Sequence, residues 1–360
     1  MADPRVEEYA EILVDKCLTI EPGNQVLVAG SPLAAPLIRE IVRRIARKDA
    51  YALMRISLDG GPATPIEWST EAPMERLAEA APITVHEFEQ ADALIHVDAP
   101  TNVRDRSALA QERQAALQAA GRPLVGRMLE GTLQWTGCQY PCPALAQEAG
   151  MSTDEFADFL YGAVLLDWDA ERERMQRYCD RFDAADEVRI VGPGTDVRFS
   201  LEGRKGRVDA YGANIPGGEF FFSPIEDSAE GVIEFSEFAG SYGGRDIEGI
   251  RLRFEGGRVV EASARTNEDF LLKTIDTDEG ARGVGELGIG CNPGITRYMK
   301  NTLFDEKMDG TIHVALGNGF PFIGGENVST VHWDIVKDLR EGGRIELDGE
   351  VVQENGSWLI

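Results

Sequence analysis

Residues 24–57 read NQVLVAGSPLAAPLIREIVRRIARKDAYALMRIS, and this stretch predicts the fold of the first half of the chain. Its first seven residues form a nearly continuous apolar run, which is typical of a buried strand in a parallel sheet. Ser31 and Pro32 follow as the N-cap and first turn of an amphipathic helix, and a second strand is predicted at 51–57. Strand, helix and strand in this order indicate a parallel sheet flanked by helices.

The same alternation continues further along the chain. The pattern predicts a helix in MERLAEAA (74–81), a strand at 91–100 and a helix at about 107–120. A capping box formed by Ser152 and Glu155 then begins a helix that we expect to continue to about Asp180.

The pattern changes after about residue 185. Short alternating runs such as DVRFSLEG and IRLRFEGGRVVEASA are separated by Gly-rich turns, which is typical of antiparallel β structure. We therefore predict an α/β domain with a mostly parallel sheet at 1–181. An α+β, β-rich domain is predicted at 182–360.

The charge composition is strongly acidic. The chain has 62 Asp and Glu against 36 Lys and Arg, a net charge of −26, and only seven lysines. Such a surface repels phosphate backbones, so we expect no nucleic-acid partner. Acid excess together with scarce lysine predicts adaptation to concentrated salt, as in halophilic organisms, and an ordinary acidic enzyme is the alternative.

No apolar run approaches the roughly 18–20 residues that cross a bilayer, and the first residues lack the apolar core of a signal peptide. We therefore expect a cytoplasmic protein with no membrane partner. The five cysteines are odd in number, which disfavours a disulfide framework. The sequence CQYPC (138–142) lacks a second Cys/His pair nearby, so we interpret its cysteines as structural rather than as zinc ligands.

The four histidines are unevenly placed. His332 and Asp334 lie two residues apart in GGENVSTVHWDIV (324–336), and on a strand both side chains project from the same face. With His313 of TIHVAL they form a candidate site for Zn²⁺, Co²⁺, Mn²⁺ or Fe²⁺. We expect His96 to be a hydrogen-bonded core residue and His86 to be a surface residue.

Two glutamates are weaker candidates. Glu286 lies among glycines in GVGELGIG, and Glu219 stands at the junction of NIPGGE and an apolar strand. A glutamate beside glycines is more often a solvated turn residue, so spacing alone does not assign either to the site.

Longer motifs resemble the aminopeptidase T / aminopeptidase S family of metallo-aminopeptidases, the thermophilic-type leucyl aminopeptidases. The resemblance covers most of the chain and lies in EILVDKCLTIEPGNQVLVAG, YPCPALAQEAGMSTDEFADFLY, NIPGGEFFFSPIEDSAEGVIEFS, GVGELGIGCNPGI, HVALG and ENVSTVHWD. It implies an N-terminal α/β domain, a β-rich metal-binding domain, a homodimer and short peptide substrates.

The resemblance also implies roles for single residues. The family's metal ligands match Glu219, Glu286, His313, His332 and Asp334. The family holds two divalent ions, of which zinc, cobalt, manganese and magnesium all suit these ligands. A water between the ions would attack the scissile carbonyl. Glu286 would act as a ligand, as the general base, or as both.

One position departs from the family pattern and leaves alternatives open. Phe320 stands where the family has a functional tyrosine, so a phenol that would hydrogen-bond an oxyanion is missing. A mononuclear iron dioxygenase of the 2,5-dihydroxypyridine type, another metal-dependent hydrolase, and a binding protein with a vestigial site are the alternatives. Glu226 and Asp227 are candidates for binding a substrate ammonium group, although a solvated pair is the simpler interpretation.

Overall fold

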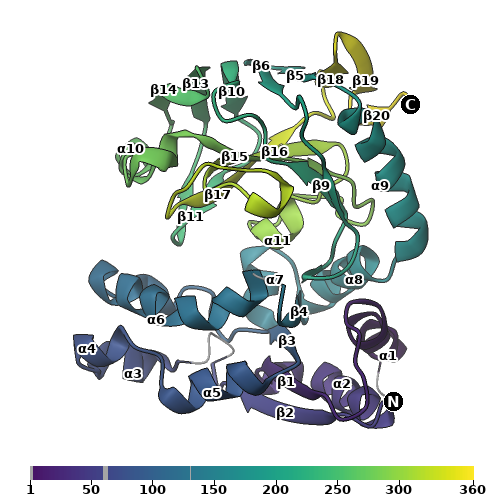
Figure 1. Cartoon of the computed structure of the whole chain (residues 1–360), viewed down its shortest axis with the longest axis vertical. Helices are drawn as coiled ribbons and strands as arrows, with labels where there is room; N and C mark the ends of the chain where they lie inside the picture. Colours follow the sequence, from purple (N-terminus) through teal and green to yellow (C-terminus); the bar gives the residue numbers. More distant parts are fainter. Residues whose placement is uncertain (1–2, 60–63, 130) are drawn as a thin grey trace. The chain divides into compact units, whose positions relative to one another are not determined.

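The computed structural model describes residues 3–59, 64–129 and 131–360, and the chain forms two compact units (Figure 1). The first unit comprises Met1–Leu165 and Tyr211–Pro216, and the second comprises Leu166–Ala210 and Gly217–Ile360. The domain boundary that we place between residues 181 and 182 remains a prediction.

The first unit contains a five-stranded sheet whose strands are all parallel. Its order is β2 (Tyr51–Ile56), β1 (Gln25–Gly30), β3 (Ala93–Asp98), β4 (Gln134–Gln139) and β8 (Asn214–Ile215). The predicted parallel α/β fold is therefore confirmed. The sequence pattern did not predict β4, nor that the two residues of β8 join this sheet from the second half of the chain.

Helices connect these strands. They are α1 (Pro4–Glu11), η1 (Ile12–Lys16), η2 (Pro32–Ala34), α2 (Ala35–Arg47), α3 (Ile66–Glu71), α4 (Met74–Leu77), α5 (Pro82–Gln90), η3 (Asp105–Ala108), α6 (Gln111–Leu129), α7 (Pro143–Glu148) and α8 (Thr153–Val164). Because parallel crossovers are right-handed, the strand order puts α2 on one face of the sheet and α5 and α6 on the other.

Three helix predictions need correction. Ser31 does cap the chain after β1, but a 3₁₀ turn precedes α2. The helix predicted at 74–81 is a single turn that ends at Leu77, and Pro82 holds Ala81 in an extended conformation, so this turn does not continue into α5. The helix expected from Ser152 to about Asp180 is two helices, since the Asp167 side chain accepts a hydrogen bond from Ala170 N and begins α9 (Trp168–Asp183).

The second unit contains two main antiparallel sheets, as the alternating runs predict. The eight-stranded sheet has the order β14 (Arg258–Ser263), β13 (Ile250–Glu255), β10 (Glu230–Phe235), β6 (Thr195–Ser200), β5 (Glu187–Gly192), β18 (Arg344–Leu347), β19 (Glu350–Glu354) and β20 (Ser357–Trp358). The five-stranded sheet, called the ligand sheet below, has the order β17 (His332–Asp338), β16 (Thr311–Gly317), β15 (Val284–Gly290), β9 (Glu219–Phe222) and β7 (Arg207–Asp209).

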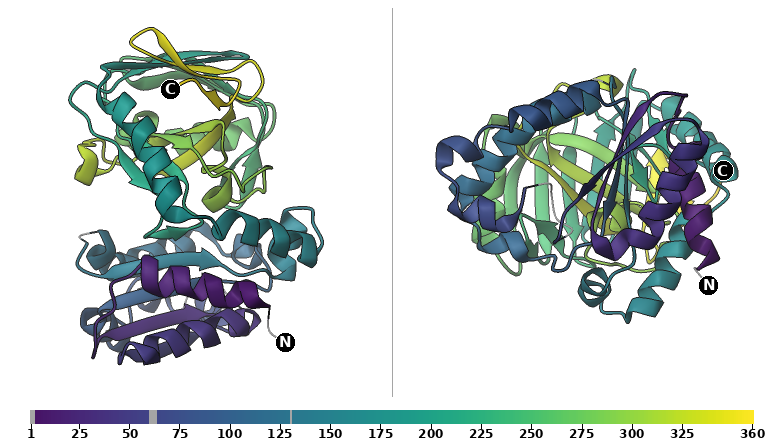
Figure 2. Two further views of the ribbon diagram at one scale, coloured as in Figure 1. Left: turned by 90° about the vertical axis from the view of Figure 1, so that its right-hand side faces the viewer. Right: turned by 90° about the horizontal axis from the view of Figure 1, so that it is seen from below.

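Smaller elements complete the second unit. They are α9, the hairpin β11 (Gly240–Tyr242) and β12 (Arg245–Ile247), α10 (Glu268–Ile275), η4 (Glu279–Arg282), α11 (Thr302–Asp305) and η5 (Pro321–Ile323). The two main sheets form layers of this unit (Figure 2).

The ligand sheet buries one face in the core of the second unit. The side chains of Trp333 and Ile335 lie beside Gly240 and Ile250, and Phe220 of β9 packs edge-on against Phe182 of α9 with ring centroids 5.1 Å apart. Residues that alternate with these apolar side chains project from the opposite face, and that face carries the candidate site.

Other expectations concern single residues. His86 is exposed, and His96 is half-buried on β3, where burial lowers its pKa. Cys138 and Cys142 are buried and free of disulfides, and the Cys142 thiol donates a hydrogen bond to the Pro100 carbonyl. Within residues 3–59, 64–129 and 131–360, the structure contains no helix that is long and apolar enough to cross a membrane.

Candidate metal centre

Four neighbouring strands bring the five candidate ligands to one face of the ligand sheet. Glu219 lies on β9, Glu286 on β15, His313 on β16, and His332 and Asp334 on β17. Antiparallel pairing places Glu219 opposite Gly290, His313 opposite Gly288, and Ala315 opposite both Glu286 and Asp334. Opposed residues of an antiparallel pair share a face, so all five side chains project to the same side.

The ligand face is lined with small residues. On β16, Ala315 and Gly317 follow His313 on this face, whereas Ile312 and Val314 project into the core. A Cβ atom at Gly288 would lie 2.0 Å from Cε1 of His313, so the imidazole occupies the space that a side chain would fill. Glycine at this position is therefore a requirement of the site.

A β-bulge sets the direction of Glu286. The register between β15 and β16 shifts between Val284 and Glu286, which leaves Gly285 as the extra residue. The Gly285 carbonyl accepts a hydrogen bond from the Ser223 hydroxyl at 2.8 Å, and a Cβ at this glycine would lie 2.2 Å from the Asn318 carbonyl oxygen. The bulge is thus fixed from two sides.

The side chains form two groups of three potential ligands that share Glu286. Glu219, Glu286 and His313 form one group, Glu286, His332 and Asp334 form the other, and the ligand atoms of each group lie within 4.8 Å of one another. Nε2 of His313 is 3.4 Å from Oε1 of Glu286, and Nε2 of His332 is 3.3 Å from its Oε2. Each oxygen of Glu286 therefore belongs to a different group.

Backbone carbonyls orient both imidazoles. Nδ1 of His313 lies 3.0 Å from the Glu306 carbonyl oxygen, and Nδ1 of His332 lies 2.9 Å from the Asn318 carbonyl oxygen. Because a carbonyl only accepts, Nδ1 carries the proton in each ring and Nε2 faces the carboxylates. A second-shell acceptor of this kind is usual for histidines that bind metals through Nε2.

Burial and unsatisfied oxygens show that the cluster fits a divalent cation. Glu219 is 6% exposed, Glu286 5% and His313 1%. Oε2 of Glu219 and Oδ1 of Asp334 are buried and have no hydrogen-bond partner. Unpaired buried carboxylate oxygens are costly unless a cation satisfies them, and imidazole with carboxylate is a ligand set that Zn²⁺ accepts.

Lys307 is a residue of the site that the sequence analysis missed. Its side chain is fully buried, and Nζ lies 3.1 Å from Oε1 of Glu219 and also pairs with Glu306. It holds one oxygen of Glu219 and leaves the unsatisfied oxygen directed toward His313. The only sequence signal was that one of the chain's few lysines occurs six residues before His313.

The electrostatics of the cluster differ between its members. Burial raises the pKa of Glu219 to about 8, although Lys307 opposes the shift, and burial raises the pKa of Asp334 to about 6. Burial would also raise the pKa of Glu286, but hydrogen bonds from His313 and His332 lower it to about 2. Without a cation, protons on the imidazoles balance the carboxylates.

The two histidines show the opposite effect. Burial lowers the pKa of each imidazole, but the hydrogen bond to Glu286 and the surrounding carboxylates raise the pKa of His313 to about 10 and that of His332 to about 9. A cation that binds here must displace these protons.

Phe320 lies beside this cluster, as the sequence position suggests. Its ring centroid is 5.1 Å from that of His332, and it also packs against Phe221 and Phe322. The side chain at this position offers no hydroxyl. Glu226 accepts hydrogen bonds from Arg204 and from Glu326 N, both at 2.7 Å, and Asp227 is exposed.

Comparisons with known proteins place the chain in context. The family model described as thermophilic metalloprotease (M29) matches residues 2–358. "Aminopeptidase 2" of Geobacillus stearothermophilus is 27% identical, with 99% of this chain and 98% of the relative covered. Wild-type AmpT from Thermus thermophilus, a solved structure, is similar with a TM-score of 0.84 and 23% identity over 99% of both chains.

A second solved structure bears on the alternative activity. The 2,5-dihydroxypyridine dioxygenase of Pseudomonas putida KT2440 matches with a TM-score of 0.60 and 15% identity, covering 99% of this chain and 96% of that one. At this identity the likeness concerns the fold alone.

Proposed function

We propose that this chain, which belongs to the family of thermophilic metalloproteases (M29) and is a metal-dependent aminopeptidase, uses two divalent ions. In this proposal, a water activated between the two ions releases N-terminal residues from peptides. The proposed ligands are Glu219, Glu286, His313, His332 and Asp334. The observation that carries the proposal is the sharing of Glu286 between two groups of three ligands.

The charge of the cluster supports two ions rather than one. The carboxylates of the three acidic ligands, Glu219, Glu286 and Asp334, carry three negative charges when the imidazoles are neutral. A hydroxide formed from the attacking water would add a fourth. Two divalent cations supply the matching +4, whereas one would leave a buried excess of negative charge.

Bound divalent ions supply Lewis-acid chemistry, since they lower the pKa of a bound water toward about 7 and polarise a carbonyl. The protein's own groups fix the geometry for that chemistry. His313 and His332 are held with Nε2 toward Glu286 by backbone carbonyls, and Lys307 restrains Glu219. Zinc, cobalt, manganese and magnesium are all compatible with this set, and zinc suits the two imidazoles best.

Glu286 has two proposed roles. Its oxygens lie near different imidazoles, which supports the role of a ligand shared by both ions. The resemblance to the aminopeptidases implies a general base that carries a proton from the attacking water to the leaving amine. Glu286→Gln preserves the shape of the side chain and removes its basicity, so this variant tests both roles.

The dioxygenase alternative is less well supported than the peptidase. The aminopeptidase relative matches almost the whole chain, whereas the likeness to the dioxygenase concerns the fold alone. A single-iron site also requires fewer ligands than the two groups that meet at Glu286. The absence of a hydroxyl at Phe320 therefore concerns the rate of peptide hydrolysis rather than the type of reaction.

Three further features belong to the proposal. We expect a homodimer, which the resemblance implies and light scattering after size exclusion would test. The cysteines of the described residues form no disulfide bonds, which suits the reducing cytoplasm. The acid excess and scarce lysine are expected to adapt the protein to concentrated salt.

The central test combines metal analysis with activity. Metal-stripped protein is reloaded with Zn²⁺, Co²⁺ or Mn²⁺, bound metal is counted by mass spectrometry, and hydrolysis of aminoacyl chromogenic amides is followed in molar KCl. We expect two ions per chain, and we expect His332→Ala to lose metal and activity while retaining its circular dichroism spectrum. His86→Ala is the matched control, since His86 is exposed.

The outcomes separate the alternatives. A stoichiometry of one ion per chain with full activity would overturn the two-ion mechanism. Absence of turnover with every metal, followed by ring cleavage of hydroxylated pyridines with iron and oxygen, would establish the dioxygenase instead.

A further inference from the structure

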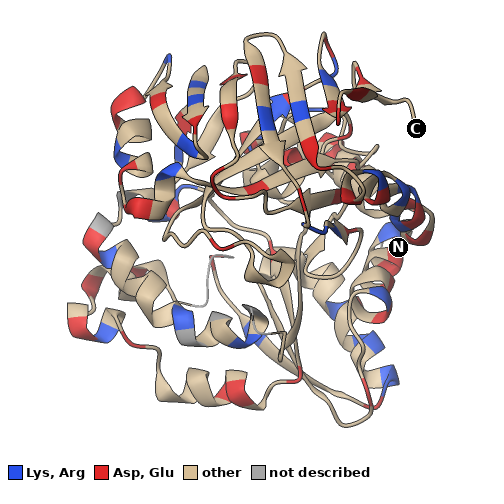
Figure 3. Ribbon diagram, turned by 45° about the horizontal axis from the view of Figure 1, so that its top comes forward, with Lys and Arg blue, Asp and Glu red and all other residues tan. Residues whose placement is uncertain are grey.

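A basic cavity lies at the edge of the ligand sheet. It has a volume of about 670 Å³ and is lined by the segment 202–207 and by residues 322–324. Its charged lining residues are three cations, Arg204, Lys205 and Arg207, and one acid, Glu202. The chain has 62 acidic and 36 basic residues, and the acidic residues are spread over the ribbon (Figure 3), so this local excess of positive charge is the reverse of the composition of the chain.

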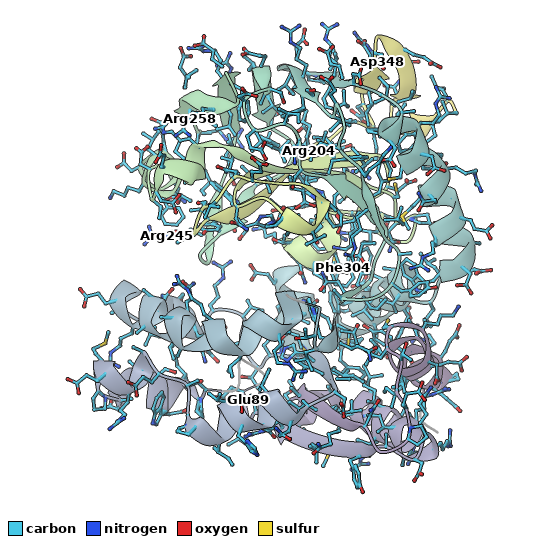
Figure 4. The ribbon with its side chains drawn as sticks, in the orientation of Figure 1. Glu89, Arg204, Arg245, Arg258, Phe304 and Asp348 are labelled. Atoms are coloured by element: carbon cyan, nitrogen blue, oxygen red, sulfur yellow. The ribbon has the colours of Figure 1, made fainter. Side chains whose placement is uncertain are left out.

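Two of the three cations already have partners. Arg204, which is labelled in Figure 4, donates to Glu226 at 2.7 Å, and Nζ of Lys205 lies 3.5 Å from a carboxylate oxygen of Asp183. Arg207 is exposed, and its guanidinium lies 5.1 Å above the ring of Phe322. Among the described residues, no carboxylate lies within ion-pair distance of Arg207, although its charge is attracted by that of Asp209, two residues along β7. Its donors remain available to a ligand.

Arg207 projects from the same face of the sheet as the metal ligands. Strand pairing places Arg207 opposite Phe221, Phe221 opposite Gly288, and Gly288 opposite His313. The four residues thus form one row across β7, β9, β15 and β16. Neighbouring strands are about 4.8 Å apart, so three spacings put Arg207 about 14 Å from His313 along the sheet.

Aromatic contacts give a second path between the two sites. The Arg207 guanidinium lies on Phe322, the Phe322 ring is 5.3 Å from that of Phe320, and the Phe320 ring is 5.1 Å from that of His332. An extended peptide covers about 3.4 Å per residue, so a distance of about 14 Å corresponds to about four residues. The aromatic surface between the sites suits the apolar parts of such a chain.

We propose that Arg207, with the basic cavity around it, binds the free α-carboxylate of short peptides whose N-terminal residue lies at the metal centre. The α-carboxylate is the one anion that every unmodified peptide carries, and guanidinium binds carboxylates through paired hydrogen bonds. The inference rests on the proposed function and adds a substrate class, peptides of three to five residues with a free C-terminus. Arg207 is a specificity-determining residue in this scheme, remote from the reacting bond.

The test compares peptides that differ only at the C-terminus. Leu-Ala peptides of two to eight residues are prepared as free acids and as amides, and kcat and KM are measured with the metal-loaded full chain. We expect kcat/KM for the free acid to exceed that for the amide by about tenfold or more near four residues, mainly through KM. The ratio is expected to approach one for the dipeptide and the octapeptide.

Variants assign the effect to one residue. Arg207→Gln should reduce the acid-to-amide ratio to about one, mainly through a higher KM for the free acids. Arg245→Gln is the matched control, because Arg245 is also exposed and also lies over a ring, that of Phe270 at 4.9 Å, but belongs to the β11–β12 hairpin. Equal ratios at every length, or a ratio retained in Arg207→Gln, would overturn the proposal.

Binding measurements distinguish this inference from the proposed function. If no peptide is hydrolysed, the tetrapeptide acid and amide are titrated into the protein by calorimetry. Tighter binding of the acid by about tenfold, lost in Arg207→Gln, would support the carboxylate site although the peptidase mechanism had failed. Equal binding of both peptides, or no binding of either, would refute it.

Discussion

The substitution Gly288→Ala tests the geometry of the candidate metal centre directly. The new Cβ would lie 2.0 Å from Cε1 and 2.1 Å from Nε2 of His313, whereas carbon atoms normally approach to about 3.5 Å. The imidazole must therefore move by about 1.5 Å, because the atoms of the backbone around β15 are held in the sheet. Metal–ligand distances tolerate only about 0.2 Å, so His313 would be lost as a ligand.

The magnitude follows from that displacement. Overpacking of this kind costs about 1–3 kcal/mol of folding stability. We expect metal affinity to fall by about tenfold to a hundredfold or more, the loss typical even of second-shell changes at metal sites. The dissociation constant is measured by chelator competition, bound metal by mass spectrometry, and fold by circular dichroism and thermal melting.

A matched control keeps the result interpretable. Gly137 on β4 also lies in a strand, but a Cβ there would have its nearest neighbours at 3.7 Å, an ordinary contact. Gly137→Ala should therefore leave metal binding unchanged. Wild-type metal affinity in Gly288→Ala, with the protein folded, would refute the assignment of His313 as a ligand.

Three further predictions concern pH, the aromatic position and salt. In metal-free protein the pKa of His313 is raised to about 10 and that of His332 to about 9, so the folded state binds more protons than the unfolded state above pH 6.5. The thermal stability of the metal-free protein should therefore fall as the pH rises from 7 to 10. Metal-loaded protein should not show this loss. A flat profile for the metal-free protein would contradict the proton-balanced cluster. Phe320→Tyr should raise kcat for aminoacyl amides by at least about tenfold, since a hydrogen-bond donor to the oxyanion stabilises the transition state by about 2.7–4 kcal/mol. An unchanged kcat would mean that another group already donates this hydrogen bond. The melting temperature should rise steeply between 0.1 and 2 M KCl, because salt shortens the Debye length from about 10 Å to below 3 Å and so screens the repulsion between acidic side chains. A salt-independent melting temperature would exclude adaptation to salt.

The alternation of small or polar residues with large apolar residues along the strands explains why the face that carries the ligands could be predicted from the sequence. In TIHVALG, His313, Ala315 and Gly317 occupy one face and large apolar residues the other. GELGIG shows the same pattern for Glu286 and its glycines. A period of two thus separates the core from the site in each strand. Assigning Glu219 and Glu286 to the site additionally required the family resemblance, since the pairings of β9 with β15 and of β15 with β16 join residues that are distant in sequence.

Other features of the fold and of the site could not be predicted from the local sequence pattern. Strand β8 has two residues, too few for any periodicity, and its position depends on pairing with β4. The bulge at Gly285 depends on contacts with Ser223 and Asn318, which come from other parts of the chain. Lys307 reads as a charged surface residue in sequence, and only the folded chain buries it beside Glu219.

The positions of the lysines bear on the interpretation of the charge composition. Two of the seven, Lys307 and Lys337, are fully buried, and each pairs with a carboxylate, Lys337 with Glu237 at 2.7 Å. A buried lysine is not readily replaced by arginine, because the compact ammonium and the planar guanidinium require different spaces. A pressure that acts on hydrated surfaces would remove exposed lysines and spare these two, whereas a uniform bias against lysine would not distinguish them. The two buried lysines are what a pressure on hydrated surfaces, such as adaptation to salt, would spare, whereas the other five lysines show that such a pressure did not remove lysine from outside the core entirely.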